Sequence, residues 1–252
     1  MSIDSLDAAQ PRSSAVRSTG ARVWGWIWKL ALIALLLPVL QVIILKWVNP
    51  PFSTMMIYQS IEHLFSGEAV TFSHSNLSWD EIPDAFVQAS IAGEDQRFFS
   101  HNGFDWTEIE NAQLEHQRHP NRPMRGASTL SQQTAKNLFL PPWHSFIRKG
   151  VEAYYTVLIE FFWSKQRILQ MYSNIAQLGP NQFGLEAAAE YHFHKHAWEL
   201  SAVECARLAA TLPNPERWSA SHPSPYILRR SGRILNQMRG LPASDEDDGD
   251  PD

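Results

Sequence analysis

One long apolar segment near the N-terminus constrains this chain more than any other feature. The run "VWGWIWKLALIALLLPVLQVIILKWV" covers residues 23–48 and is interrupted by Lys29, Pro38 and Gln41. A helix needs about 20 apolar residues to cross the hydrocarbon core of a bilayer, and this run meets that length. Tryptophans lie near both of its ends, where their rings suit the membrane interface. The segment therefore predicts a transmembrane helix over residues 23–48.

A cleaved signal peptide is the alternative interpretation of this segment. It is disfavoured because the apolar run is too long and no small-residue cleavage site follows it. Three arginines precede the run within residues 1–22, whereas no lysine or arginine lies between Lys46 and Arg97. Because basic residues favour the cytoplasmic side, we expect residues 1–22 to be a cytoplasmic tail. The body would then lie on the periplasmic face of a bacterial inner membrane.

The charge of the chain is concentrated at its C-terminal end. The net charge is -5 over 252 residues, and six of the 26 acids lie within residues 243–252. Without these six, 20 acids face 21 lysines and arginines, so the body is close to neutral. We expect residues 241–252 to form an acidic disordered tail. A body without a basic excess argues against nucleic acid as a partner. The single cysteine, Cys205, excludes an internal disulfide and a cysteine-based metal cluster.

Helical patterns dominate the chain beyond the apolar segment. A proline-bearing stretch from Asn49 leads out of that segment, and we expect a membrane-proximal connection over residues 49–77. A short strand near Ala69–Phe72 is the one extended element that the pattern suggests. The fold class expected for residues 78–240 is mainly α, in one domain.

Capping signals locate the helices of this domain. Asp80 can cap a helix that has Pro83 in its first turn and runs toward Glu94. The other elements expected are helices over residues 128–139 and 147–163, a helix capped by Ser164 and ending at Gly179 and Pro180, a helix opened by the capping box Ser201–Glu204 and stopped by Pro213, and a loop over residues 115–125.

The stretch "GEDQRFFSHNG", residues 93–103, places two adjacent carboxylates at the end of an apolar helix. Apolar surroundings raise the pKa of a carboxylate toward the operating pH, as a general base requires. The pattern therefore predicts that Glu94 is a base. We expect Asp95, Phe98 and His101 to fix the backbone turn behind it.

A second polar cluster lies in "GASTLSQQTAKN", residues 126–137. On a helix, residues four apart form two neighbouring rows: Ser128, Gln132 and Lys136 in one, and Thr129, Gln133 and Asn137 in the other. Leu130 and Leu138 can face the core. Amides, hydroxyls and one lysine, with almost no acids, suit the binding of sugar hydroxyls and phosphate. An ordinary solvated face is the alternative interpretation.

A third cluster is "RKGVE", in which Arg148 and Lys149 lie four and three residues before Glu152. Taken alone, this spacing is typical of a surface salt bridge, which is worth little. Beside the two preceding clusters, we interpret it as part of the same site.

These three segments, together with "KQRILQMYSNIAQLGPNQFGLEAAAEYHF", resemble the ordered motifs of the peptidoglycan glycosyltransferases. The resemblance covers Ile82 to Ser219. The sequence carries no penicillin-binding domain, so the chain is similar to the monofunctional members of this family. Two departures are small: Ser173 stands where the family usually has leucine, and His192 interrupts a usual Tyr-Phe pair. Neither is a catalytic position.

The resemblance implies a lysozyme-like helical fold beside the membrane and a role in cell-wall biogenesis and cell shape. It implies inverting transfer from a growing glycan on undecaprenyl diphosphate to lipid II, which extends a β-1,4-linked strand. By position, Glu94 matches the base, and Glu152 matches a second essential glutamate near the donor diphosphate. Lys136 and Arg148 match cationic partners of that diphosphate. The substrate-binding residues that we predict are Asp95, Phe98, His101, Ser128, Thr129, Gln132, Gln133, Lys136, Asn137, Arg148 and Lys149.

The resemblance also implies partners. A divalent cation, Mg²⁺ or Mn²⁺, is associated with the family, and the sequence assigns no metal ligand. Lipid II, the growing lipid-linked glycan and the membrane are the expected partners, together with proteins of cell division or cell-wall synthesis.

Two other classes of function compete with this interpretation. A lysozyme-like hydrolase would also use two carboxylates, but its sugar leaving group needs a general acid and no cationic cluster. A non-catalytic membrane scaffold would not need the family's key side chains, all of which are present. Conversion of lipid II to polymer, cleavage of finished glycan, or neither would distinguish the three.

Overall fold

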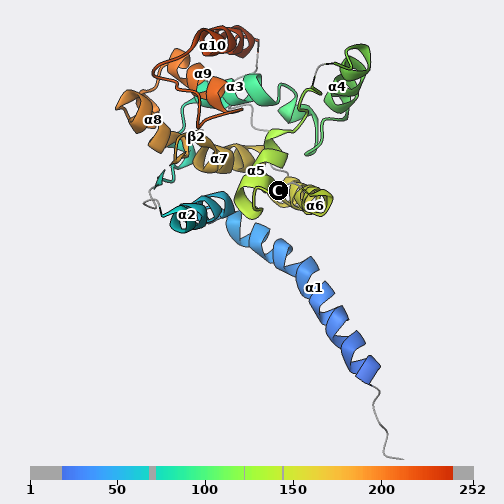
Figure 1. Ribbon diagram of the computed structural model, residues 1–252. Coiled ribbons are helices and arrows are strands. Elements are labelled where there is room, and N and C mark those ends of the chain that lie inside the picture. Colours follow the sequence, from blue (N-terminus) through green and yellow to red (C-terminus); the bar gives the residue numbers. More distant parts are fainter. Residues whose placement is uncertain (1–18, 68–71, 122, 144, 241–252) are drawn as a thin grey trace, which may run out of the picture. The chain divides into compact units, whose positions relative to one another are not determined.

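The computed structural model describes residues 19–67, 72–121, 123–143 and 145–240 (Figure 1). The chain divides into two compact units, residues 1–41 and 42–252. The first contains most of helix α1, Thr19–Leu45. Within it, Val23–Leu45 is long and apolar enough to cross a membrane, with a mean hydropathy of 2.4. The helix ends three residues before the predicted limit, because the chain turns at Lys46 ahead of a proline pair.

The second unit opens with the end of α1, which is held by two side chains far along the sequence. The indole Nε1 of Trp163 donates to the carbonyl of Val42 at 2.8 Å. The guanidinium of Arg167 donates to the carbonyls of Leu45 at 2.7 Å and Val48 at 3.0 Å. The Leu45 carbonyl, at the C-terminus of the helix, has no partner within the helix, so the bond from Arg167 satisfies a group that would otherwise need water.

Helix α2, Thr54–Ser66, lies within residues 49–77, which the sequence analysis treated only as a connection. Ser53 caps it by accepting from the backbone N–H of Met56, and Met56 is fully buried. Thr54 donates to the carbonyl of Leu138 at 2.8 Å. Four apolar side chains of α2 are exposed: Ile57, Ile61, Leu64 and Phe65, the last at 87%. The helix therefore carries a sparse buried stripe, which is why its periodicity gave no clear signal.

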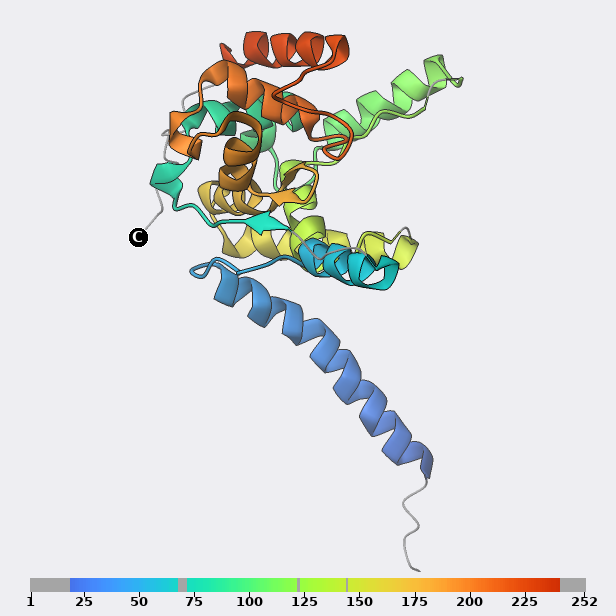
Figure 2. The ribbon, with the colours of Figure 1, turned by 60° about the vertical axis from the view of Figure 1, so that its left-hand side comes forward.

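Two groups of helices form the core of the second unit, as both ribbon views show (Figures 1 and 2). Helix α3 packs against α9 and α10, and α5 packs against α6 and α7. Most of the large buried side chains come from these helices. The mainly α prediction is confirmed. The bounds are α3 Asp84–Glu94, α5 Leu130–Phe139, α6 Phe146–Phe162, α7 Lys165–Ile175, α9 Ala202–Thr211 and α10 Pro225–Met238.

A small sheet joins these groups. Its strands are β1 Ser73–His74, β2 Gln177–Gly179 and β3 Gln182–Phe183, in the order β1-β3-β2. Strand β1 runs parallel to β3, and β2 runs antiparallel to it. The prediction that a helix continues to Gly179 was wrong. Helix α7 ends at Ile175 because the next residues pair as a strand. Helix α8, Leu185–Phe193, follows the sheet.

Two of the three capping predictions are confirmed, and one is wrong. Ser164 caps α7 and Ser201 caps α9 in a capping box, as predicted. The prediction for Asp80 was wrong: it lies inside a 3-10 helix, Trp79–Glu81, and α3 starts only after Pro83. The residue before a proline is disfavoured in the α conformation, so the chain cannot run as one helix through this point.

Two further predictions concern irregular segments. Residues 115–118 belong to helix α4, Trp106–Arg118, so the predicted loop over 115–125 was wrong in its first part. The extended chain near Ala69–Phe72 falls largely on residues 69–71, outside those described, and Arg122 is also outside them. His192 is buried, and its Nε2 bonds to the carbonyl of Leu178 at 3.0 Å.

Candidate active site

Glu94 is the last residue of α3, and its carboxylate is held by side chains from two other helices. Oε1 accepts from Nη2 of Arg230 on α10 at 2.9 Å, and Oε2 accepts from Nε2 of Gln133 on α5 at 3.0 Å. The Glu94 side chain is 15% exposed. Burial raises the pKa of Glu94 above its ordinary value, while Gln133, Arg230 and Lys136 oppose the rise. The sequence-based expectation of a desolvated carboxylate at this position is therefore met.

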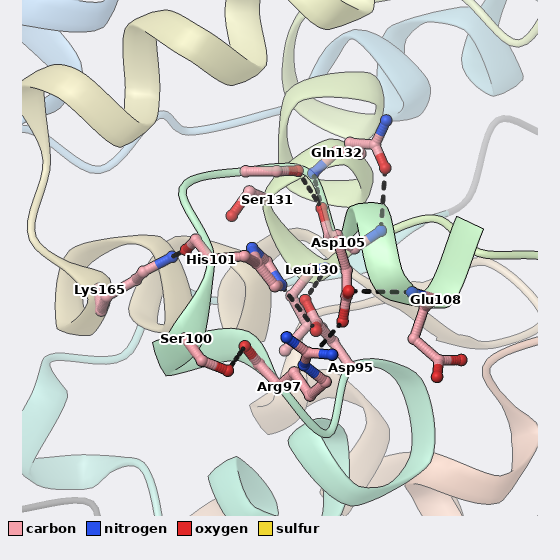
Figure 3. Close-up of polar contacts among 12 residues, drawn as sticks. Asp95, Arg97, Ser100, His101, Asp105, Glu108, Leu130, Ser131, Gln132 and Lys165 are labelled. Atoms are coloured by element: carbon pink, nitrogen blue, oxygen red, sulfur yellow. Dashed lines mark hydrogen bonds and ion pairs between the residues drawn. The ribbon is translucent and has the colours of Figure 1, made fainter. Parts of the chain in front are cut away.

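The turn behind Glu94 is docked on the start of α5 (Figure 3). Oδ1 of Asp95 lies 2.9 Å from Nε2 of His101, and Oδ2 accepts from the backbone N–H of Leu130 at 3.0 Å. Thr129, the N-cap of α5, donates to the carbonyl of Gly103 at 2.7 Å. Phe98 is fully buried beneath the turn. These bonds fix the position of Glu94 relative to the polar side chains of α5.

Lys165, at the start of α7, supports the same turn. Its Nζ donates to the carbonyl of His101 at 2.7 Å and lies 4.4 Å from the centre of the Phe98 ring. Glu160 balances this charge at 2.9 Å and also bonds to Ser131. The turn is thus tied to α5, α6 and α7 together.

A cavity of about 490 Å³ opens beside Glu94. Its wall includes residues from α3, α4, α10 and the segment before α5. Arg125 forms an ion pair with Glu108 on this wall. Residues of the wall that bear on the argument are Glu94, Arg97, Glu108, Arg125, Ser128 and Arg230.

A second cavity, of about 350 Å³, is also lined by residues of helix α5, among them Gln132 and Lys136. Ser128 and Gln133 line both cavities, so the two adjoin. The second wall carries three cations and one carboxylate: Lys136, Arg148, Lys149 and Glu152. An apolar or cationic ligand would not suit such a wall, whereas a doubly charged anion would.

Glu152 balances the cations of the second cavity. It is buried, with Nη1 of Arg148 donating to Oε2 at 3.0 Å and Lys149 paired with Oε1. Burial lowers the pKa of Lys136, and the negative charge of Glu152 is the main effect that opposes this. Buried ions need such partners, so the cluster is not an ordinary surface salt bridge.

The predicted site residues divide into three groups. Glu94, Asp95, Ser128, Gln133, Lys136, Arg148, Lys149 and Glu152 line the two cavities. Thr129 and Gln132 form a capping box at the start of α5, although Thr129 also lines the first cavity and Gln132 the second. Phe98 and His101 are turned inward, and Asn137 is not among the lining residues of either cavity.

Arg230 is the site residue that sequence reasoning missed. It lies on helix α10, 136 residues after Glu94, and outside the sequence segments selected above as candidate motifs. A faint signal existed. Ile227 and Ile234 are the buried residues three before and four after it, so Arg230 had to lie on the core-facing side of an amphipathic helix.

Within the described residues, one group of side chains has the composition of a metal site: Asp95, His101 and Asp105. These residues do not fit a resident Mg²⁺ or Mn²⁺. Both oxygens of Asp95 are already bonded, and Asp105 caps α4 while Nε of Arg97 lies 3.6 Å from its Oδ2. Nδ1 of His101 is buried without a hydrogen-bond partner, whereas a metal-bound imidazole normally donates its second N–H. The cluster therefore serves to hold the turn behind Glu94 in place.

The fold places the Glu94 carboxylate in a cavity that adjoins a second, cationic cavity. In comparison with known proteins, the model of the Transglycosylase family matches residues 62–239, and the chain belongs to this family. Among its relatives is the biosynthetic peptidoglycan transglycosylase of Pseudomonas savastanoi pv. phaseolicola, 48% identical over 203 residues. The match covers 81% of this chain and 85% of that relative.

Two other relatives carry the same name. The protein of Stutzerimonas stutzeri is 48% identical over 216 residues, which cover 86% of this chain and 88% of the relative. The protein of Pseudomonas aeruginosa is 44% identical over 207 residues, which cover 82% and 88%. The resemblance drawn from the motifs is thus confirmed over most of the chain.

Proposed function

We propose that this chain is a peptidoglycan glycosyltransferase that polymerises lipid II, with the growing lipid-linked glycan as donor and lipid II as acceptor. One observation carries the proposal. Glu94, whose side chain is only 15% exposed, lies at one cavity, and that cavity adjoins a cationic cavity through the shared lining residues Ser128 and Gln133. A base for the nucleophile and charge for the leaving group are what this transfer requires.

Glu94 acts as the general base toward the acceptor. It removes the proton of the acceptor's 4-hydroxyl as that oxygen attacks C1 of the donor sugar. Attack from the face opposite the diphosphate inverts an α-linked donor to a β-1,4 bond. The desolvated carboxylate is a stronger base than a solvent-exposed one, and positioned bases contribute about 10²–10⁴-fold to rate.

Lys136 and Arg148 stabilise the departing diphosphate in the second cavity. Diphosphate is a good leaving group that needs positive charge more than a proton, so no general acid is required. Arg148 can bind phosphate oxygens through its planar fork. Glu152 keeps Arg148 and Lys149 in place and limits the repulsion among the three cations when the cavity is empty.

Asp95, Phe98 and His101 position the base in this proposal rather than touch the sugar. All three lie in the turn between α3 and α4: Asp95 and His101 are bonded to each other (Figure 3), and Phe98 is fully buried. Loss of any of them would move Glu94 with respect to Gln133. A divalent cation, if it takes part, would be carried by the substrate's own diphosphate, since Mg²⁺ keeps most of its waters and favours phosphate oxygens.

The test is polymerisation of labelled lipid II by Glu94→Gln. The amide keeps the shape and the bond to Gln133 but cannot accept the proton, so polymerisation should fall at least about 10²-fold while substrate binding persists. The matched control is Glu110→Gln on the exposed face of α4, which should polymerise at the wild-type rate. A near-normal rate for Glu94→Gln would refute the assignment. Release of short sugars from finished glycan, with no polymer, would show a hydrolase instead.

The membrane topology is part of the proposal. The apolar helix Val23–Leu45 and the arginines of residues 1–22 support an N-terminus in the cytoplasm and a periplasmic catalytic unit at the inner membrane. A reporter that functions only after export, fused after Asp252, should be active. Activity of a reporter that works only in the cytoplasm would contradict this orientation.

The apolar helix also raises the local concentration of enzyme at its substrate. A chain that begins at Asn49 should therefore polymerise lipid II less efficiently in bilayers than the full chain. Equal rates on bilayer-embedded lipid II would show that the catalytic unit binds the membrane without the helix.

A further inference from the structure

The C-terminal helix α10 contributes one side chain to the Glu94 site that no motif accounts for. Nη2 of Arg230 bonds to Oε1 of Glu94 at 2.9 Å and to the carbonyl of Gly93 at 3.3 Å. One nitrogen therefore holds both the carboxylate and the backbone just before it. The two side chains are 21% and 15% exposed, so water screens their attraction only in part.

Packing fixes Arg230 in this place. Helix α10 starts at a Ser224 cap with proline at its first position, which defines where the helix begins. A Cβ atom added to Gly93 would lie 3.2 Å from Cδ1 of Ile234, so α3 and α10 approach each other closely beside the ion pair. Arg230 is thus presented to Glu94 by two tightly packed helices rather than by a loop.

We propose that Arg230 is a positioning residue for the transfer reaction: it keeps the Glu94 carboxylate ionised and turned toward the cavity that takes the acceptor. The inference rests on the proposed role of Glu94 as the base. Arg230 holds Oε1 and Gln133 holds Oε2, which fixes the plane of the carboxylate. Each oxygen keeps a second lone pair, so a hydroxyl proton can still be accepted.

The other groups around Glu94 make the effect of Arg230 measurable. Lys136 on α5 also favours the ionised carboxylate. On α7, burial and the charge of Glu94 raise the pKa of Tyr172 well above its usual range, so this neighbour stays neutral. Arg230 is therefore one of two cations that lower the pKa of Glu94, and its loss should raise that pKa. The remaining charged groups of the cavity wall are paired among themselves: Asp95 with His101, Arg97 with Asp105, and Arg125 with Glu108.

The experiment compares Arg230→Met with Arg229→Met, an exposed neighbour on the same helix. The readout is the pH dependence of kcat at saturating lipid II. An opposite charge at hydrogen-bond distance lowers a carboxyl pKa by about 1–3 units. In Arg230→Met, the low-pH side of the kcat profile, its acid limb, should therefore move at least about one unit to higher pH. Its KM should change little, and Arg229→Met should match the wild type.

Arg230→Lys separates charge from geometry. It keeps the positive charge, so its acid limb should stay near that of the wild type. Its kcat should nevertheless fall several-fold, because an ammonium on a flexible stem cannot keep one nitrogen between the carboxylate and the Gly93 carbonyl as the rigid guanidinium does. If Arg230→Met does not fold, as judged by circular dichroism, Arg230→Gln is measured in the same way.

Two results would overturn the inference. One is an acid limb that does not move in the neutral variants. The other is a raised KM at unchanged kcat, which would assign Arg230 to binding the acceptor. The variant Glu94→Gln distinguishes failure of the positioning role from failure of the proposed function. If Glu94→Gln stays active, Glu94 is not the base and the proposed function fails. If Glu94→Gln is inactive while the acid limb of the Arg230 variants stays at the wild-type pH, only the positioning role fails.

Discussion

Glu152 is the carboxylate whose loss should lower stability most clearly. Its side chain is 3% exposed and pairs with Arg148, which is 14% exposed, and with Lys149, which is 51% exposed. In Glu152→Gln the neutral amide cannot balance these two cations. Removing one partner of a buried ion pair costs about 3–5 kcal/mol. Because both cations reach some solvent, we expect the lower end of that range, about 3 kcal/mol.

Thermal unfolding in detergent, followed by circular dichroism, would measure this cost. In a domain of this size, 1 kcal/mol moves the melting temperature by about 2–4 °C, so Glu152→Gln should melt about 6–12 °C below the wild type. The control is Lys195→Met, which removes one partner of the pair with Glu204. Lys195 is 40% exposed, so its loss should cost about 1 kcal/mol or less.

The same variant should bind inorganic pyrophosphate more tightly, by several-fold in a calorimetric titration. The reason is that Lys136, Arg148 and Lys149 would then face the second cavity without a balancing carboxylate. A Glu152→Gln protein that melted within about 2 °C of the wild type and bound pyrophosphate no more tightly would refute the charge-balance reasoning. Glu152 would then have to act on the substrate directly.

Three further predictions concern the site charges and one glycine. The kcat of the wild type should rise with pH as Glu94, whose pKa burial raises, loses its proton. It should fall again at higher pH as Lys136, whose pKa burial lowers, loses its proton. A profile that lacks either the rise or the fall would contradict this. Lys136→Ala and Arg148→Ala should each cut lipid II turnover by orders of magnitude with unchanged circular dichroism. Arg148→Lys should keep only part of the wild-type turnover. Near-normal turnover in both alanine variants would be inconsistent with diphosphate binding. Gly184→Ala should lower the free energy of unfolding by more than about 2 kcal/mol in urea, since φ is +83° and the new Cβ would lie 2.5 Å from the Asn174 carbonyl oxygen; an unchanged urea midpoint would mean that the turn rearranges.

Local signals predicted most helices of this chain, because the physics that starts a helix is local. Ser164 and the Ser201–Glu204 box lie directly before the helices that they cap. Long-range pairing was not predictable in the same way. Helix α7 stops before Gly179 because Gln177 and its neighbours pair with β3. That pairing depends on where the sheet lies, which no short window of sequence records.

The candidate site shows the same division. Glu94, Lys136 and Glu152 could be selected from short motifs, since spacing on one helix already places their neighbours. Arg230 could not, because its contact with Glu94 exists only after α10 has packed on α3. Burial decided the rest: the sequence showed that Asp95 and His101 are polar, and the structure shows that they face each other inside a turn.

The two partners of Glu94 lie at very different distances along the chain, and this sets an order of events during synthesis. Gln133 follows Glu94 by 39 residues, whereas Arg230 follows it by 136. At about 5–20 residues per second, roughly 7 to 27 seconds separate the synthesis of Glu94 from that of Arg230. Throughout that interval the Glu94 carboxylate lacks the Arg230 guanidinium, and α3 lacks one of the helices that pack beside it. The apolar helix Val23–Leu45 is therefore synthesised well before the surroundings of Glu94 are complete.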